Sequence, residues 1–419
     1  MNQLKLLNFH KMLANFANNL VGAFIPLIIY QATNSLTYAM IYLVASKIIR
    51  LGFNYLLKNL YGKMPQLFLL LRIIPITLYN IFIFVLDAHL IIGIIGVCLF
   101  NSLDYALNNL SKEVILNYSS LTKKDDEKSL GTTRIFEQIG IIVSLVVGGY
   151  LLDFNKVIVL ILSLSIYAVS IIPLIIFYIK SRKQKTFNKD ATSNAITTLR
   201  KNKKYKEISS KLTKKMLFTY GVIYFSFAFI DMLQTCYGLH IFIQQGEFAT
   251  AGILNAIFNC FYAIGFYVAS IINEKKDMTR LVSIICIVIG ISSLLLYFVN
   301  INTAFLLVCF FYGVIGFSYP FISLFVLERM LLKTRIMACS NRALFTRETS
   351  CVMAYIVGYS FGFAGLLSIF IVTCVTMCAS SVIIPQGEEK TRKNLVDFLQ
   401  NNENIINEAN SLETNEKNA

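Results

Sequence analysis

Residues 157–180 read VIVLILSLSIYAVSIIPLIIFYIK, and residues 181–214 continue as SRKQKTFNKDATSNAITTLRKNKKYKEISSKLTK. The first stretch is apolar almost to its end, and about 20 apolar residues are needed for a helix to cross the hydrocarbon core of a bilayer. The second stretch is crowded with Lys and Arg and holds few large apolar side chains. Together they predict a membrane-spanning helix followed by a basic polar loop.

Apolar segments of the same kind recur on both sides of this loop. The predicted spans lie near residues 10–30, 37–57, 66–86, 90–117, 132–151 and 157–180, and then near 215–240, 249–272, 280–299, 303–328, 347–363 and 366–384. The composition agrees, because 56% of the residues are hydrophobic and only 15% are charged, whereas soluble domains have roughly 25% charged residues. We therefore expect an all-α polytopic membrane protein with about 12 transmembrane helices.

The basic loop also divides the chain into regions. We expect an N-terminal six-helix bundle at residues 1–180, a cytoplasmic linker at 181–214, a C-terminal six-helix bundle at 215–384 and an acidic cytoplasmic tail at 385–419. The tail differs from the linker in composition, because it is rich in Asn and Glu rather than in Lys.

The net charge of +15 is distributed unevenly along the chain. The connectors between predicted spans fall into two alternating sets. One set holds most of the 38 Lys and Arg, while the other holds only Lys156. Because Lys and Arg are retained on the cytoplasmic side during insertion, we expect both termini and the middle loop to be cytoplasmic. A nucleic-acid-binding surface would need its charges on one soluble face, so we expect no nucleic-acid partner.

The cysteines and the N-terminal segment give no sign of metal chemistry or processing. The nine Cys include no C-x-x-C pair and lie mostly in predicted spans, so we expect no disulfide framework, metal site or cofactor. The first apolar segment follows Lys5 and Lys11, lacks a small-residue cleavage site and carries Asn15. We therefore expect an uncleaved first span and an integral protein of the plasma membrane, with the lipid bilayer as its surroundings.

The fifth predicted span carries a regular pattern of small residues. Its members are Gly131, Gly140, Ser144, Leu145, Gly148 and Gly149. With the two sets of six spans, this pattern resembles the signature G-x8-G-x3-G-P-x2-G-G that marks antiporters of the major facilitator superfamily. The sequence departs from that signature at Ser144 and Leu145, where the family has Gly-Pro. The resemblance implies two six-helix bundles and an exporter. Ordinary close packing of helices through small residues is the alternative interpretation.

A second signature of that family is only partly retained. Residues 55–63 read YLLKNLYGK, in which Gly62 and Lys63 fit the family pattern and Asn59 stands where an acidic residue is expected. The fourth span also lacks the Arg that proton-coupled drug exporters of the family place there. The resemblance therefore does not by itself imply proton coupling.

Four charged residues lie deep in predicted spans: Lys47, Arg50, Asp104 and Asp231. An ionised side chain at mid-bilayer costs about 2.5–3.5 kcal/mol, so each needs a partner, water or a task. An ion pair of Asp104 with Lys47 or Arg50 is one explanation, and a substrate or proton site is the other. We expect Asp104 and Asp231 to face a central cavity between the halves. Arg72, near the start of the third span, is expected to extend to the cytoplasmic interface.

Polar side chains also form stripes along the predicted helices. The candidate substrate- or ion-binding residues are Asn18, Asn19, Asp104, Asn108, Tyr224, Asp231, Gln234, Asn259 and Tyr262. In the resembling family, spans one, four and seven line the central cavity. A surface of Asn, Tyr and Phe with few carboxylates suits an amphipathic or cationic organic solute. Hydrogen bonds between helices are the alternative role for each Asn or Tyr.

These observations predict a secondary active transporter that exports a small amphipathic or cationic organic solute by alternating access. Its partners would be that solute and a proton or another coupling ion. A lipid or polymer flippase with another many-span fold is one alternative, and a membrane-embedded transferase is another. We do not expect an enzyme, because His10, His89 and His240 lie far apart near span ends and no soluble catalytic domain is present.

Overall fold

The computed structural model describes residues 3–61, 69–121, 126–183, 214–272, 279–322 and 341–401, which form long α-helices joined by short connections. No β-strand occurs in these ranges. Eleven helical segments within them are long and apolar enough to cross a membrane. The all-α membrane architecture expected from the sequence is confirmed.

The first helix group contains the helices of the N-terminal half. These are α1 (Gln3–Gly22), α2 (Ile25–Thr33), α3 (Leu36–Tyr61), α5 (Ile73–Ala88), α6 (Leu90–Leu121), α7 (Asp126–Phe154) and α8 (Lys156–Lys183). Helices α1 and α2 together make one span, which the apolar pattern predicted to be continuous. The span is interrupted after Gly22 because Pro26, near the start of α2, has no N–H to donate to the carbonyl of Gly22.

The second helix group contains the helices of the C-terminal half. These are α11 (Lys214–Gln245), α12 (Phe248–Ile272), α13 (Thr279–Phe298), α14 (Ile301–Ile322), α17 (Asn341–Gly362) and α18 (Leu366–Asn401). Helix α17 is not among the eleven apolar spans, because its first turns hold Arg342, Arg347 and Glu348. It lies between α14 and α18 in the chain, at the place of the predicted span 347–363.

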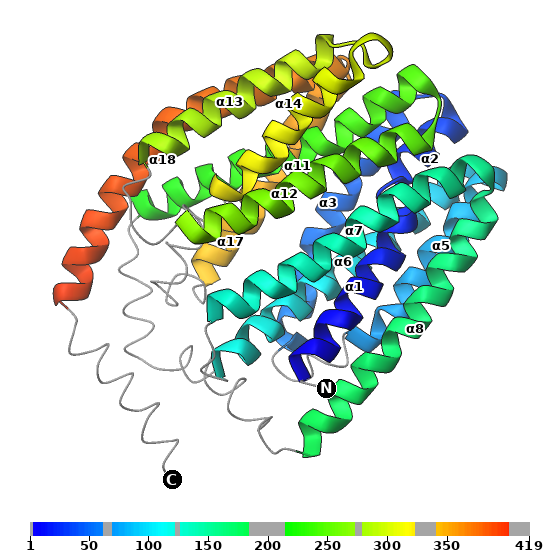
Figure 1. The fold of residues 1–419 in the computed structure, drawn as a ribbon, viewed down its shortest axis with the longest axis horizontal. Coiled ribbons are helices and arrows are strands. Elements are labelled where there is room, and N and C mark those ends of the chain that lie inside the picture. The colour runs from blue at the N-terminus through cyan, green and yellow to red at the C-terminus, as the bar shows by residue number, and fades with distance from the viewer. Residues whose placement is uncertain are drawn as a thin grey trace.

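Helix packing separates the two groups and also shows where they meet. In the first group α1 packs against α7 and α8, and in the second α13 packs against α14 and α18. Three helix pairs join the groups in the part of the chain that the structure describes: α7 with α12, α3 with α17, and, less extensively, α2 with α11. In Figure 1 the blue-to-green helices of the first group lie beside the green-to-red helices of the second. A site between the groups is therefore expected near these pairs.

The helices run between two ends of the molecule, which we call the near end and the far end. The near end is the one where α1 begins, and the far end is the one where α7 ends and α12 begins. Residues 184–213 of the predicted linker and 402–419 of the predicted tail lie outside the described residues. The division of the chain into four regions, and the side of the membrane that each end faces, stay predictions.

Candidate transport site between the helix groups

A carboxylate on α11 is held by two tyrosine hydroxyls. Asp231 lies in the middle of the span, and its side chain is exposed. Tyr319 on α14 donates a hydrogen bond of 2.9 Å to Oδ1 of Asp231, and Tyr355 on α17 donates one of 3.1 Å to Oδ2. Three helices of the second group thus fix the position of one negative charge.

Two cations on α3 face this carboxylate from the first group. The ammonium of Lys47 lies 4.0 Å from the ring centroid of Tyr355, and the guanidinium of Arg50 lies 3.5 Å from that of Tyr105 on α6. Lys47 interacts electrostatically with Arg50 and with Asp231. In the part of the chain that the structure describes, neither cation is within ion-pair distance of a carboxylate. Both are therefore oriented by aromatic rings without being neutralised.

We call this cluster the interface site. It consists of Lys47, Arg50, Tyr105, Asp231, Tyr319 and Tyr355. More aromatic rings continue from it into the second group. The ring centroid of Tyr319 lies 5.5 Å from that of Tyr262 and 5.6 Å from that of Phe227, and Phe227 contacts Tyr224 at 6.3 Å. The structure thus brings Tyr224 and Tyr262 into the surroundings of Asp231.

Two other predicted residues of the second group take part in hydrogen bonds within and between its helices. The side-chain amide of Asn259 is buried and donates to the carbonyl of Asn255 over 2.7 Å, within α12. The backbone carbonyl of Gln234 accepts a hydrogen bond of 3.3 Å from Tyr312, which also donates to Oδ1 of Asn255 over 2.8 Å. These contacts join α11, α12 and α14 and lie apart from the interface site.

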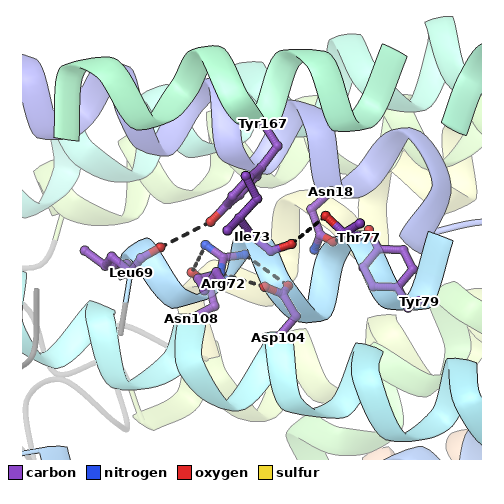
Figure 2. Close-up of polar contacts among 9 residues, drawn as sticks. All are labelled: Asn18, Leu69, Arg72, Ile73, Thr77, Tyr79, Asp104, Asn108 and Tyr167. Carbon is purple, nitrogen blue, oxygen red and sulfur yellow. Dashed lines mark hydrogen bonds and ion pairs between the residues drawn. The ribbon is translucent and has the colours of Figure 1, made fainter. Parts of the chain in front are cut away.

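A second ionic cluster lies inside the first helix group, and we call it the buried arginine pair (Arg72 and Asp104; Figure 2). Nε of Arg72 donates to Oδ1 of Asp104 over 2.7 Å, and Nη2 donates to Oδ2 over 3.1 Å. Nη1 of Arg72 donates to Oδ1 of Asn108 over 3.2 Å. Each partner of the pair is only 1% exposed. The planar fork of the guanidinium thus satisfies both oxygens of the carboxylate.

The partners of these charges differ from those that the sequence suggested. Asp104 pairs with Arg72 and not with Lys47 or Arg50, which lie on aromatic rings. The expectation that Arg72 extends to the membrane interface is wrong, because this side chain points inward from the start of α5 to α6. Asp104 is likewise enclosed in its helix group and does not open toward a space between the groups.

The polar residues of the first span are also engaged. Tyr79 on α5 donates a hydrogen bond of 2.8 Å to Oδ1 of Asn18, beside the buried arginine pair (Figure 2). The amide of Asn19 donates to the carbonyl of Asn15 over 2.8 Å. Asn18 therefore links α1 to α5, and Asn19 bonds within its own helix.

The small residues of α7 allow close contact with α1. Gly131, Gly140 and Gly148 all lie in this helix. A Cβ atom added at Gly148 would lie 2.7 Å from the carbonyl oxygen of Leu20, and one added at Gly140 would collide with the carbonyl oxygen of Met12. These backbone contacts require the absence of a side chain, so the glycine pattern fixes α7 against α1 within the first group.

The same helix also contacts α12 of the second group. A Cβ atom at Gly149 would lie 2.7 Å from the carbonyl oxygen of Phe248, and one at Gly252 would collide with the carbonyl oxygen of Leu145. Ser144 is fully buried and bonds back to the carbonyl of Ile141 over 2.7 Å. Through its contacts with α1 and with α12, α7 is one of the helices at which the groups meet.

A carboxylate fastens the two groups at the far end. The oxygens of Asp153, at the end of α7, accept hydrogen bonds of 2.8 Å each from the backbone N–H groups of Phe248 and Ala249. Asp153 thus caps the N-terminus of α12 across the group boundary, where the helix dipole favours a negative charge. The ring of Phe24 packs edge-on against Phe248, with centroids 6.1 Å apart. The groups are in contact at the far end.

Several residues of these contacts were not predicted from the sequence. Tyr319 and Tyr355 lie 88 and 124 residues from Asp231 along the chain, and no local pattern links them. Tyr105 could have been predicted as a candidate, since it is adjacent to Asp104 in a predicted span. Asp153 bonds to Phe248 and Ala249, which lie 95 and 96 residues further along the chain, so no local pattern indicated this cap.

Solved transporter structures share this fold at low sequence identity. A bacterial homologue of the iron transporter ferroportin in its inward-facing state has a TM-score of 0.64 at 10% identity, with 92% of this chain and 98% of that chain covered. A POT family transporter in complex with a thioalcohol-conjugated peptide has a TM-score of 0.65 at 13% identity, with 92% and 96% covered. The nucleoside transporter NupG has a TM-score of 0.62 at 16% identity, with 92% and 98% covered. Such likeness shows the fold alone.

The sequence itself matches a family. No curated protein matched the chain in sequence. The sequence model of the Major Facilitator Superfamily matches residues 118–341, which is more than half of the chain. The fold also sets aside the flippase of another architecture and the membrane-embedded transferase. The chain belongs to the major facilitator superfamily and is a transporter rather than an enzyme.

Proposed function

We propose that this transporter exports a small amphipathic organic solute with a cationic group, and that the cationic group binds Asp231 between the two helix groups. The observation that carries the proposal is the exposed carboxylate of Asp231 at the middle of α11. A charge at that depth needs water or a partner. The two tyrosine hydroxyls hold the carboxylate in place but do not neutralise it.

The position of Asp231 supports an opening toward the inside of the molecule. Helix α11 is the most enclosed of the candidate spans, because 78% of the residues in its apolar stretch are buried. An exposed side chain on such a helix has little lipid to face. Its neighbours, α14, α17 and α3, include a helix of the other group. A solute that binds there touches both groups.

The contacts that fasten the two groups at one end support alternating access as the mode of transport. The contacts of Asp153 and Phe24 with α12 close the far end. If the basic connectors are cytoplasmic, the far end is extracellular, and a site closed at that end would open to the cytoplasm. Outward opening would release these far-end contacts, while the contact of Gly252 on α12 with Leu145 on α7, further from the far end, would supply a closely packed pivot.

The direction of transport rests on the resemblance of α7 to the antiporter signature. Gly140 and Gly148 of that pattern contact α1 within the first group, and Gly149 contacts α12, across which a movement of the groups would act. Export from the cytoplasm across the plasma membrane, in exchange for a proton or another cation at Asp231, is the reaction that we propose. Asp231 would then be occupied in turn by the solute and by the coupling ion.

Dye transport tests the proposal. Inverted membrane vesicles that contain the transporter should accumulate a fluorescent cationic dye when an ion gradient is imposed. Asp231→Asn keeps the size of the side chain and removes its charge, so dye accumulation should fall at least about tenfold. Asp87→Asn is the matched control, because Asp87 is an exposed carboxylate paired with Lys156 at a helix end. Equal accumulation by the parent and Asp231→Asn would refute the proposal.

A further inference from the structure

We propose that the solute is a zwitterion, with an amine that binds Asp231 and a carboxylate that binds Lys47 and Arg50. This inference rests on the proposed function, since it uses the same site. It adds the second charge of the solute and assigns α3 of the first helix group to its recognition.

The charges of the interface site do not balance among themselves. Among the described residues, the charged groups that interact electrostatically with Lys47 are Arg50 and Asp231, so two cations of the interface site face one carboxylate. A solute that is only a cation would satisfy Asp231 and leave both cations without a counter-charge. A solute that is only an anion would meet Asp231 as a like charge. A zwitterion gives each charge in the site an opposite partner, which offsets the desolvation that binding causes.

Aromatic rings keep the two cations in place for such a ligand. Lys47 lies on the ring of Tyr355, and the same residue donates its hydroxyl to Asp231. Arg50 lies on the ring of Tyr105. A ring face attracts and orients a cation but leaves its N–H groups able to donate. A carboxylate has two oxygens, so Lys47 and Arg50 can each donate to one of them.

The buried arginine pair shows what a purely structural arrangement looks like in the same protein. Arg72 donates two hydrogen bonds to Asp104, and both side chains are enclosed. Lys47 and Arg50 are half-buried, Asp231 is exposed, and no ion pair joins them in the described ranges. In the buried arginine pair the hydrogen-bond donors and acceptors bind one another. In the interface site they remain able to bind a ligand.

The two ends of the ligand would be held by different helix groups. The carboxylate partners lie on α3 and the amine partner lies on α11. A zwitterion would therefore bridge the groups, whereas a simple amine would contact mainly the second. The aromatic rings of Tyr262, Tyr319 and Phe227 would receive an apolar part of the ligand. A small amino acid or dipeptide with an aromatic side chain has this chemistry.

Ligand binding to the purified full-length transporter tests the inference. The probes are phenylalanine and alanyl-phenylalanine, each as the free zwitterion, as the carboxamide and as the N-acetyl derivative. Binding is measured by calorimetry, and thermal shift gives an independent readout. We expect at least one zwitterion to bind at least tenfold more tightly than both of its capped forms. Both an amino acid and a dipeptide are used, because the distance between the amine and the carboxylate differs between them.

Variants assign each end of the ligand. Asp231→Asn should weaken the zwitterion and the carboxamide at least tenfold, whereas Lys47→Gln combined with Arg50→Gln should make the zwitterion bind no better than the carboxamide. Lys47→Arg keeps the positive charge. With Arg50 unchanged, this variant should keep most of the preference for the zwitterion over the carboxamide. Asp87→Asn, outside the site, serves as the folding control.

The outcomes separate this inference from the proposed function. Carboxamides that bind as tightly as zwitterions, or no binding of any of the six probes while dye transport still depends on Asp231, would overturn the zwitterion and leave the proposed function standing. If Asp231→Asn changes neither dye transport nor zwitterion binding, both the proposed function and the zwitterion inference are overturned.

Discussion

Two regions of the molecule place a basic residue and an aspartate on membrane helices, and their surroundings differ. In the buried arginine pair, Arg72 and Asp104 are each 1% exposed and share two hydrogen bonds. In the interface site, Asp231 is exposed and bound by tyrosine hydroxyls, while Lys47 and Arg50 lie on aromatic rings. A charge that is satisfied within one helix group belongs to the fold. A charge left accessible between the groups is available to a ligand.

The largest effect on stability is expected at the buried arginine pair. Arg72→Ala would leave Asp104 enclosed without a counter-charge, which costs about 3–5 kcal/mol for a buried pair. We expect a large fall in folded yield and in the unfolding temperature in detergent. Replacing both partners, with Arg72→Met and Asp104→Leu, should recover most of the stability. A single Arg72→Ala variant as stable as the parent would contradict a structural role.

A backbone contact within the first helix group gives the next effect. A Cβ atom at Gly148 would lie 2.7 Å from the carbonyl oxygen of Leu20, whereas one at Gly52 would meet nothing within 4 Å. We expect Gly148→Ala to lower the free energy of unfolding by about 1–3 kcal/mol, as overpacking does. Gly52→Ala should raise it by up to about 1 kcal/mol through helix propensity. Both changes are measured by thermal unfolding. If the two variants shift the unfolding temperature in the same direction, the packed and the open glycine are not distinguished.

The cap at the far end acts between the groups and should alter their arrangement more than their stability. Asp153→Ala removes both acceptors at the start of α12, and the loss of such a cap costs about 1 kcal/mol. The ratio of far-end-closed to far-end-open molecules should fall about fivefold. Spin labels at Ala88 and Phe298, one in each group, in a cysteine-free background would report it as a longer-distance population. An unchanged distance distribution would mean that the cap does not hold the groups together.

The smallest effect is expected at an exposed ion pair. Lys156 on α8 donates to both oxygens of Asp87 on α5 over 2.9 Å, and the carboxylate side is well exposed. Exposed pairs contribute about 0.2–1 kcal/mol. Lys156→Ala should therefore change the unfolding temperature little and leave dye transport intact. A loss as large as that of Arg72→Ala would show that burial does not separate the two kinds of pair.

Much of the fold could be predicted from local pattern. Long apolar runs determine membrane spans, because backbone groups in lipid must be bonded within the segment. The break between α1 and α2 was also predictable, since Pro26 is visible in the sequence and removes a helical hydrogen bond. The glycines of α7 were recognised from spacing, and Gly140, Gly148 and Gly149 among them lie at close backbone contacts.

The partners of the charges could not be predicted in the same way. Helical periodicity tells which residues share a face but not which helix that face meets. Arg72 and Asp104 are 32 residues apart on different helices, and their contact depends on how α5 packs against α6. The tyrosines that hold Asp231 come from helices much further along the chain. Asp231 itself could be singled out because a mid-span carboxylate is costly wherever it lies.

The most direct test compares the two aspartates in one transport measurement. Dye accumulation per folded transporter is measured for Asp231→Asn and for the double variant that replaces Arg72 by Met and Asp104 by Leu. We expect Asp231→Asn to fold like the parent and lose at least about tenfold in transport, while the double variant keeps most of its transport once folded protein is counted. Normal transport by Asp231→Asn together with its loss in a folded double variant would place the functional charge in the buried arginine pair and contradict the assignment of the interface site.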